Sequence, residues 1–600
     1  MAAPLLCARD LQFMLYELFD SESLTQRPRY ADHSVETFNA AIDTAQSIAE
    51  KYFLPIRKKV DEQQPTFDGK NVHMIPEIKV AVDAATQAGF VSSTSDYELG
   101  GMQLPLIVAG VASAYLSAAG STTMGYLALS SANANLIENH GSAEQIETWV
   151  KPIRSGRFAG TMAMTEPSAG SGLADLTTTA IPAGDGTYRI RGNKIFISGG
   201  DHELNENIVH LVLARIKGAP AGVKGISLFI VPKILVNADG SLGERNDVAL
   251  AGLFHKMGGR GQTSTALSFG ENDGAVGYLV GEEHRGLSYM FHMMNEARVM
   301  VGTNAACTAL TGYQYSLDYA RERLQGRLPS CKDPSSAPVN IVEHADVRRM
   351  LLAQKAYAEG AFALCMLGSQ LADDKNTALS EKERLDAHTL LDFLTPIIKT
   401  WPSEYGPKAN DLAIQILGGH GYINEHPVEM FYRDNRLNPI HEGTTGIQSL
   451  DLLGRKLPMN NLAGYRAFLA TVQSTIDEAL TGDLAPIADK LSGAVATLEK
   501  TTEHLLGAML EKPIDLVMAN SVKYLELFGH VVIAWLWLRQ GLVAQSGLAA
   551  KPHEADTHFY LGKLQAMKYF YNFELPLIDV WSKNLLDLDA TFYEMDNNWF

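Results

Sequence analysis

The sequence has 600 residues but only four cysteines. Cys7, Cys307, Cys331 and Cys365 lie far apart, and they form neither a paired zinc-ligand spacing nor a dense disulfide pattern. A reducing compartment is therefore the better expectation. We predict four buried or inert thiols and no metal site.

Positive charge is also scarce in this chain. It carries 50 Lys and Arg against 68 Asp and Glu, which gives a formal charge of -18 at pH 7. Nucleic acids and anionic lipids bind basic surfaces, because the binding releases counterions. The excess of acidic residues therefore disfavours both as partners. A local basic pocket for a phosphate group remains compatible with it.

Long uncharged apolar runs are missing as well. A membrane-spanning helix needs about 20 predominantly apolar residues, and the run VVIAWLWL at 531–538 is too short and typical of a core helix. The N-terminal segment has a short apolar opening without a basic leader, which disfavours a secretory signal. We therefore expect no transmembrane segment and a cytoplasmic protein.

The chain is long enough for several domains, and its 46% of hydrophobic residues is enough to form their cores. Apolar residues recur at helical spacing in most of it, but a central part has short β-branched runs, such as GISLFIVPK, between Gly, Asn and Asp turns. The predicted fold is mostly α with a central β domain. The predicted parts are an N-terminal arm (1–35), a helical domain (36–156), a middle β domain (157–283), a helical bundle (284–458) and a C-terminal helical extension (459–600).

Three clusters of residues could carry chemistry, and two of them are rich in glycine. Gly, Ser and Thr crowd the segment 162–180, where backbone N–H groups and hydroxyls could bind an anionic ligand, although a surface loop is the commoner explanation. Gly418, Gly419 and Gly421 follow an apolar helical segment. These glycines allow close approach of a ligand or simply end a helix, and their spacing is not the dinucleotide fingerprint.

The third cluster is HEGTTGIQSLDLLGRK at 441–456, in which Glu442 precedes an apolar helix. A carboxylate at a helix N-terminus is often a capping feature that interacts with the helix dipole. The alternative is a catalytic base. The cluster alone leaves both interpretations open.

Together and in this order, the clusters resemble the acyl-CoA dehydrogenase family over about 36–456. The matching motifs are TEPSAGS at 165–171, FIS at 196–198, QILGGHG at 415–421 and EGT at 442–444. The resemblance implies a helical domain, a small β-barrel domain and a helical bundle. The arm and the extension resemble larger bacterial members, which include fatty acyl-CoA and methylthiopropionyl-CoA dehydrogenases.

The resemblance also implies the reaction, in which a fatty acyl-CoA is converted to the trans-2-enoyl-CoA. Glu442 would abstract the α proton, and the flavin of FAD would accept the β hydride. An electron-transfer flavoprotein would then take the electrons, and the assembly would be a homodimer. An acyl-CoA oxidase, or a dehydrogenase of a heteroatom-containing acyl-CoA such as methylthiopropionyl-CoA, remains an alternative.

Site residues follow from the family's motif positions. Arg323 corresponds to the arginine that the family places on the neighbouring subunit's flavin, and Arg298 to an arginine near the CoA end. Met162, Gly172, Ser198 and His441 depart from the family's usual residues. The residues implied to bind FAD are Met162, Met164, Thr165, Ser171, Phe196, Ser198, Arg323, Gln415, Gly418, Gly419 and Thr444, and those implied to bind substrate are Ser171, Asn295, Arg298 and Gly443.

Two other functions are weighed against this one. The DNA-associated branch of the superfamily should have a basic C-terminal domain, whereas residues 461–600 contain 10 Lys and Arg against 17 Asp and Glu. A scaffold that has lost its chemistry would not need the complete EGT motif at 442–444. Both functions are therefore disfavoured.

Overall fold

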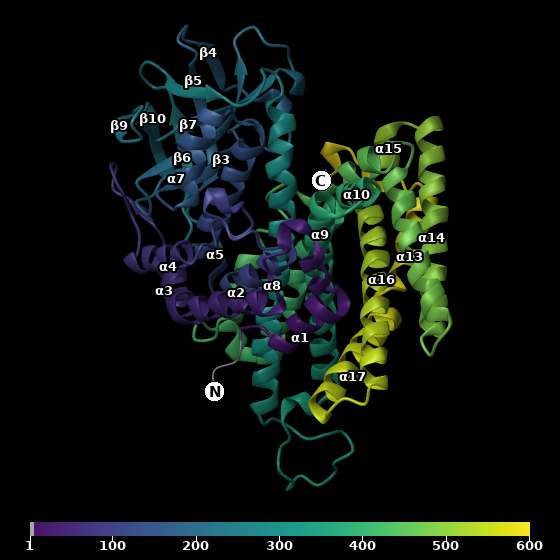
Figure 1. The fold of residues 1–600 in the computed structure, drawn as a ribbon. Helices are drawn as coiled ribbons and strands as arrows, with labels where there is room; N and C mark the ends of the chain where they lie inside the picture. The colour runs from purple at the N-terminus through teal and green to yellow at the C-terminus, as the bar shows by residue number, and fades with distance from the viewer. Residues whose placement is uncertain (1–4) are drawn as a thin grey trace. The chain divides into compact units, whose positions relative to one another are not determined.

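The computed structural model describes residues 5–600, which fold into two compact units (Figure 1). One comprises Met1–Ala31 and Arg298–Phe600, and we call it the helical unit. The other comprises Asp32–Ala297, and we call it the α/β unit. The predicted fold class, mostly helical with a central β region, is confirmed.

Helices occupy the first half of the α/β unit. Ser34 caps α2 through a reciprocal capping box with Thr37, which satisfies backbone N–H groups at the start of the helix. The longest helix, α5, is kinked at Gly120, where the backbone leaves helical geometry. The helices are α2 (Val35–Ile48), α3 (Arg57–Glu62), α4 (Pro76–Gln87), α5 (Leu106–His140), α6 (Ala143–Gln145) and α7 (Lys151–Arg154), and a short hairpin pairs β1 (Thr66–Phe67) with β2 (Val72–His73).

An eight-stranded sheet fills the rest of this unit. Its strands follow the order β10-β11-β5-β12-β7-β6-β3, with β4 paired to β5 and β6. The interior strand β7 is buried at every residue, which fits its sequence ISLFIVP, in which Ser227 is the one polar residue. The strands are β3 (Phe158–Ala163), β4 (Thr179–Pro182), β5 (Tyr188–Ser198), β6 (Asn207–Ile216), β7 (Ile226–Pro232), β10 (Val248–Leu253), β11 (Ser264–Phe269) and β12 (Ala275–Leu279), beside a separate pair, β8 (Ile234–Val236) and β9 (Leu242–Arg245).

Long helices form the core of the helical unit. Helices α9 and α10 pack along each other, and α10 starts at a Ser380–Glu383 capping box. Helix α10 ends at Leu417, where Gly418 adopts a φ of +59°, so the glycines that follow do end a helix. The helices are α8 (Gly286–Glu322), which enters this unit at Arg298, α9 (Ala345–Thr377), α10 (Glu381–Leu417), α11 (Val428–Asn435) and α12 (Thr445–Leu450), and a π-helical turn, η12 (Asp451–Lys456), continues α12.

The C-terminal extension belongs to the same unit. Its central helix, α16, contributes Trp535 and Trp537 to the core, at 1% and 0% exposure. The extension therefore has its own buried core and is not a solvated tail. Its helices are α13 (Ala463–Leu480), α14 (Ala485–Glu511), α15 (Ile514–Met518), α16 (Ser521–Ala549), α17 (Glu554–Tyr569), α18 (Leu577–Leu586) and α19 (Thr591–Glu594).

Aromatic residues join the extension to the helical core. Trp401 and Tyr405 of α10 stack with ring centroids 4.4 Å apart, and the Trp401 indole donates to His530 Nδ1 of α16 at 3.4 Å. Burial lowers the pKa of His530 to about 3, so this histidine is neutral at physiological pH. In addition, Tyr357 of α9 donates to the Glu574 carboxylate at 2.7 Å. Apolar faces of the extension are thus covered by α9 and α10.

Charged side chains attach the N-terminal arm, which begins with α1 (Ala8–Gln12) and the π-helical turn η1 (Phe13–Leu18). Lys563 of α17 is fully buried and forms ion pairs with Asp10 of the arm and, at 2.8 Å, with Glu359 of α9. Arg9 pairs with Asp556 at 2.6 Å. Buried charges are costly unless paired, so this network specifies how the arm docks.

Two helices, α5 and α16, are long and apolar enough to cross a membrane by length and composition. Their most apolar windows are 61% and 83% buried inside the structure, and a buried core helix passes the same test. The run at 531–538 lies inside α16, so the prediction of a core helix there is confirmed. The apolar run is only part of this helix, which spans 29 residues in all.

The structure tests the predicted burial of the four cysteines. All four cysteines of the described chain are free, and Cys307 and Cys365 are buried. Cys7 and Cys331 are exposed, because the arm and the loop after α8 leave these positions at the surface. Burial is therefore confirmed for Cys307 and Cys365, and the inertness of Cys7 and Cys331 stays a prediction.

Candidate functional site

The EGT motif forms a tight turn between α11 and α12 of the helical unit. Glu442 has a φ of +53° and Gly443 a φ of +89°, a region that residues other than glycine rarely adopt. Such strain persists only where the surroundings enforce it, and it is common at functional sites. Thr444 caps α12 by accepting from Ile447 N at 3.3 Å. The capping role considered for Glu442 therefore belongs to Thr444.

The Glu442 carboxylate is buried, and the charges of two cationic side chains act on it. Its Oε2 atom is buried and has no hydrogen-bond partner among the side chains and backbone groups that the structure describes. Burial raises the pKa of Glu442, whereas the charges of Arg298 and Lys399 act in the opposite direction. A carboxylate with a raised pKa and an unused oxygen is well suited to accept a proton near neutral pH.

The Arg298 side chain is buried and ion-paired. Its side chain is 3% exposed and pairs with Asp451 Oδ2 at 3.2 Å. Burial lowers the pKa of Arg298, while Asp451 and Glu442 act against that effect. This geometry places Arg298 in the electrostatic field of Glu442. Asn295, the other predicted substrate residue of α8, lies three residues earlier and is partly buried.

The end of α10 and the end of α8 carry the other predicted residues of this unit. A side chain added at Gly418 or Gly419 would meet no atom within 4 Å in the described part of the chain, so the backbone here is open to a ligand. Gly421 differs, because an added Cβ would lie 2.4 Å from Ile414 O. Gln415 and Arg323 are both exposed.

The sequence did not predict three polar side chains that hold the EGT turn. Lys399 of α10 is fully buried and donates to Gly443 O at 2.8 Å. Gln448 of α12 donates to Glu442 O at 3.0 Å, and the Thr445 hydroxyl donates to Glu404 of α10. The only signal in the sequence was a lysine inside the apolar run LTPIIKTW, which helical periodicity alone does not connect to a turn 43 positions away.

In the α/β unit, the TEP motif is fixed by a buried ion pair. Glu166 and Lys194 have fully buried side chains 2.9 Å apart, and Glu166 also accepts from the backbone of Thr177 and Thr178. Burial alone would raise the pKa of Glu166, but Lys194 and these hydrogen bonds outweigh it and lower the pKa to about 2. Glu166 is therefore a permanent anion that shapes this loop.

The same pair lies where the TEP loop meets the strand that leads to Phe196. Lys194 also donates to Met164 O at 2.9 Å, and Ile195 N donates to Thr165 O at 2.9 Å, which joins the TEP loop to the FIS segment. Phe196 has a φ of +57° and is 59% exposed, so a large aromatic ring is presented at the surface. Met162 and Ser198 are partly buried nearby on β3 and β5, and Ser171 is exposed.

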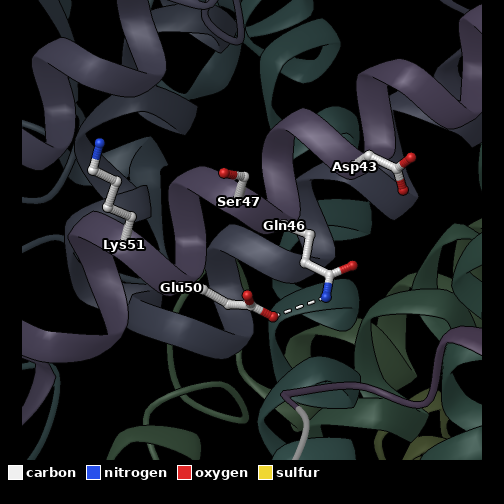
Figure 2. Close-up of a pocket in the computed structure, with 5 residues that line it drawn as sticks. All are labelled: Asp43, Gln46, Ser47, Glu50 and Lys51. Atoms are coloured by element: carbon white, nitrogen blue, oxygen red, sulfur yellow. Dashed lines mark hydrogen bonds between the residues drawn. The ribbon is translucent and has the colours of Figure 1, made fainter.

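A shallow depression elsewhere in the α/β unit carries none of the predicted residues. It is lined by Asp43, Gln46, Ser47, Glu50 and Lys51, and Figure 2 shows Gln46 donating to Glu50, at 2.8 Å. These side chains lie along one continuous helical surface and are typical of a solvated face. Among the side chains that the structure describes, no group of three or more His, Cys, Asp or Glu could hold a metal ion.

Four family models match the chain from its first helical domain to its last helices. The acyl-CoA dehydrogenase N-terminal domain matches residues 36–157, the middle domain 161–271 and the C-terminal domain 284–457. A model described as acetyl-CoA dehydrogenase C-terminal like matches 468–596. The boundaries of the five predicted parts remain predictions.

Curated relatives cover nearly the whole chain. The 3-methylmercaptopropionyl-CoA dehydrogenase of Ruegeria pomeroyi is 35% identical over 564 residues, 94% of each chain. The broad-specificity linear acyl-CoA dehydrogenase FadE5 of Mycobacterium tuberculosis is 33% identical over 608 residues, 99% of each chain. The chain belongs to the acyl-CoA dehydrogenase family, as its motifs predicted, and it is therefore an oxidoreductase of that class.

Solved structures share the fold. Caenorhabditis elegans ACDH-11 in complex with C11-CoA has a TM-score of 0.74 at 18% identity, covering 98% of this chain and 95% of that one. The acyl-CoA dehydrogenase of Bacillus anthracis complexed with FAD also has a TM-score of 0.74, at 21% identity, covering 95% and 92%. The predicted acyl-CoA dehydrogenase fold is confirmed, including its N-terminal arm and C-terminal extension.

Proposed function

We propose that this protein is an FAD-dependent dehydrogenase that converts a fatty acyl-CoA to the trans-2-enoyl-CoA, with Glu442 as the base. The observation that carries the proposal is the Glu442 carboxylate itself. Its Oε2 atom is buried without a hydrogen-bond partner in the described chain, on a strained turn and in the field of Arg298 and Lys399. A structural carboxylate would be expected to use both oxygens.

The residues present fit FAD. The open backbone at Gly418 and Gly419 leaves room for close approach of a phosphate or sugar, and exposed Phe196 offers an aromatic surface to a ring system. When bound, FAD supplies the two-electron acceptor for the β hydrogen. The residues proposed to hold it are Met162, Met164, Thr165, Ser171, Phe196, Ser198, Gln415, Gly418, Gly419 and Thr444, with Arg323 from a second subunit.

The role of Glu442 is to remove the α proton of the thioester. That proton is only weakly acidic, so the base must be ionised and correctly positioned before it can react. Burial raises the pKa of Glu442 and makes it a stronger base, and the nearby cations keep an ionised population available. The turn that carries Glu442 is fixed by Lys399 and Gln448, which restricts where its side chain can point.

The substrate is proposed to be an acyl-CoA thioester, bound with the help of Ser171, Asn295, Arg298 and Gly443. The relative from M. tuberculosis favours a linear fatty acyl group, and the relative from R. pomeroyi favours 3-methylmercaptopropionyl-CoA as the alternative. We expect turnover with an artificial electron acceptor on at least one member of a panel of linear and thioether acyl-CoAs. A panel without any turnover by FAD-loaded protein would contradict the proposal.

An acyl-CoA oxidase is the second candidate, because it would use the same base. The two differ in the fate of the electrons, since an oxidase passes them to oxygen and releases peroxide. We expect little peroxide and little oxygen uptake when substrate is added without an acceptor. The proposed physiological acceptor is an electron-transfer flavoprotein, and the proposed location is the cytoplasm.

Arg323 tests the proposed homodimer. It is exposed at the end of α8, as a residue that reaches a second subunit should be. Arg323→Ala is expected to weaken FAD retention roughly 10-fold, because a cation is removed from the cofactor's phosphates. The protein should still fold with an unchanged melting temperature of the apo form.

The measurement is FAD content after gel filtration. The control is Arg349→Ala, which removes an exposed arginine of α9 that pairs with its neighbour Asp346. Equal FAD retention in the two variants would show that Arg323 does not contact the cofactor.

A further inference from the structure

The EGT turn is held at two successive carbonyl groups by buried side chains. Gln448 Nε2 donates to Glu442 O at 3.0 Å, and Lys399 Nζ donates to Gly443 O at 2.8 Å. Lys399 and Gln448 are both 0% exposed, and they come from different helices, α10 and α12. Neither bond belongs to regular secondary structure, so these side chains compensate for the strain of the turn.

Packing leaves little freedom around this arrangement. A Cβ added to Gly443 would lie 2.4 Å from Gln448 Nε2. A glycine is therefore needed for the backbone to approach the Gln448 side chain this closely. The Thr445 hydroxyl donates to Glu404, which lies on α10 five residues after Lys399. Helix α10 thus contacts Gly443 and Thr445, the residues before and after the Thr444 cap.

The two anchors differ in charge, although their geometry is similar. Gln448 is neutral, whereas Lys399 brings a cation whose charge reaches the Glu442 carboxylate. Burying a lysine is costly, and Gln or Met would be cheaper if a hydrogen bond to Gly443 O or mere packing were the only requirement. Burial lowers the pKa of Lys399 to about 8, while Glu442 and Glu404 act to raise it, so the side chain is mostly cationic near neutral pH.

We propose that Lys399 is a positioning residue with two functions: it fixes the Glu442 turn through Gly443 O, and its charge favours the ionised base. This inference rests on the proposed function, because it assigns Lys399 a part in proton abstraction by Glu442. Gln448 shares the first function and lacks the second. The two residues therefore form a natural pair of test and control.

Other charged groups also act on the pKa of Glu442 or of Lys399. Arg298 of α8 lies in its field, and it is paired with Asp451 of η12, which also pairs with Arg455 at 2.5 Å. Glu404 of α10 acts on Lys399. Arg298 is partly neutralised by its partner, so removing Lys399 should have a measurable effect on the base.

The experiment compares Lys399→Met with Gln448→Met in the FAD-loaded, full-length protein. Methionine matches glutamine in length, keeps all but the terminal ammonium of lysine, and removes the hydrogen bond in both variants. Both variants are expected to lose roughly 10- to 100-fold in kcat, because small displacements of a base are costly. Only Lys399→Met is expected to move the acidic limb of the pH profile, upward by about 1 unit.

The sign follows from which form of Glu442 reacts. The ionised carboxylate is the base, and loss of a neighbouring cation raises its pKa further, so a higher pH is needed for activity. Lys399→Gln serves if Lys399→Met does not fold, because it keeps a donor and removes the charge. It should show the same shift with a smaller loss of kcat. FAD content and melting temperature show which variants are folded.

An unshifted limb in folded Lys399→Met or Lys399→Gln would overturn the inference, and so would an equal shift in Gln448→Met. Failure of the proposed function is separate, because it would appear as full activity of Glu442→Gln. An inactive Glu442→Gln together with an unshifted Lys399 variant would reject the role of Lys399 alone.

Discussion

Glu442→Gln is expected to lower kcat by roughly 10²- to 10⁴-fold, the range that a positioned acid or base contributes. The amide has nearly the same shape as the carboxylate but cannot take up the α proton. The Oε2 position is buried without a partner in the described chain, so the change breaks no hydrogen bond of this atom there. Steady-state turnover with an artificial acceptor measures the effect.

The variant should keep its yellow colour and its melting temperature. Removing a carboxylate whose pKa is raised by burial costs the folded state little, because its charged form is disfavoured there. Glu499→Gln, at an exposed position on α14, is the matched control and should be fully active. Activity of Glu442→Gln within a few-fold of the control would remove the assignment of the base.

Deletion of the chain after Pro458 is expected to abolish recovery of soluble protein. The deletion uncovers α9 and α10, where Trp401 and Tyr405 are each 3% exposed beneath the extension. Each large apolar side chain returned to water costs about 1.5–3 kcal/mol, and an uncovered apolar face of this kind promotes association. Light scattering and sedimentation of the truncated chain measure the outcome.

A milder variant keeps the experiment informative if the truncated chain never folds. Trp537 of α16 is fully buried, and its indole donates to Ala356 O of α9 at 3.2 Å. Trp537→Ala should cost about 3–5 kcal/mol of unfolding free energy. Leu510→Ala, at an 88% exposed position on α14, should cost almost nothing.

We propose that the full-length chain is a homodimer in the same experiment, because the extension covers the surface of α9 and α10 and so removes it from contact with further subunits. A stable tetramer at micromolar concentration would contradict this covering role. An active, soluble dimer after the deletion would show that the extension has another purpose.

Structural features that depend on neighbouring residues in the sequence could be predicted. The change from helical to strand texture near Gly156 precedes β3, which starts at Phe158, and the glycines at 418–421 do end α10. The family motifs also predicted Glu442, whose surroundings fit a base. Each of these features depends on neighbouring residues, so the local pattern contains the necessary information.

Features that depend on distant partners could not be predicted. Lys399 looks like one charge within an apolar helix, and its contact with Gly443 depends on how α10 passes the EGT turn. Arg298 was expected at the CoA end, but its buried pair with Asp451 becomes visible only when α8 and η12 are placed together. Helical periodicity predicts which face is buried but not which polar groups meet there.

Anaerobic addition of an acyl-CoA to the purified FAD-loaded protein tests the central claim most directly. The visible absorbance of the flavin is followed while the thioester product is analysed by mass spectrometry. The account predicts bleaching of the absorbance, together with one equivalent of 2-enoyl-CoA that has lost two hydrogens. A flavin that stays oxidised in the presence of the whole acyl-CoA panel, or a protein that cannot be loaded with FAD, would contradict it.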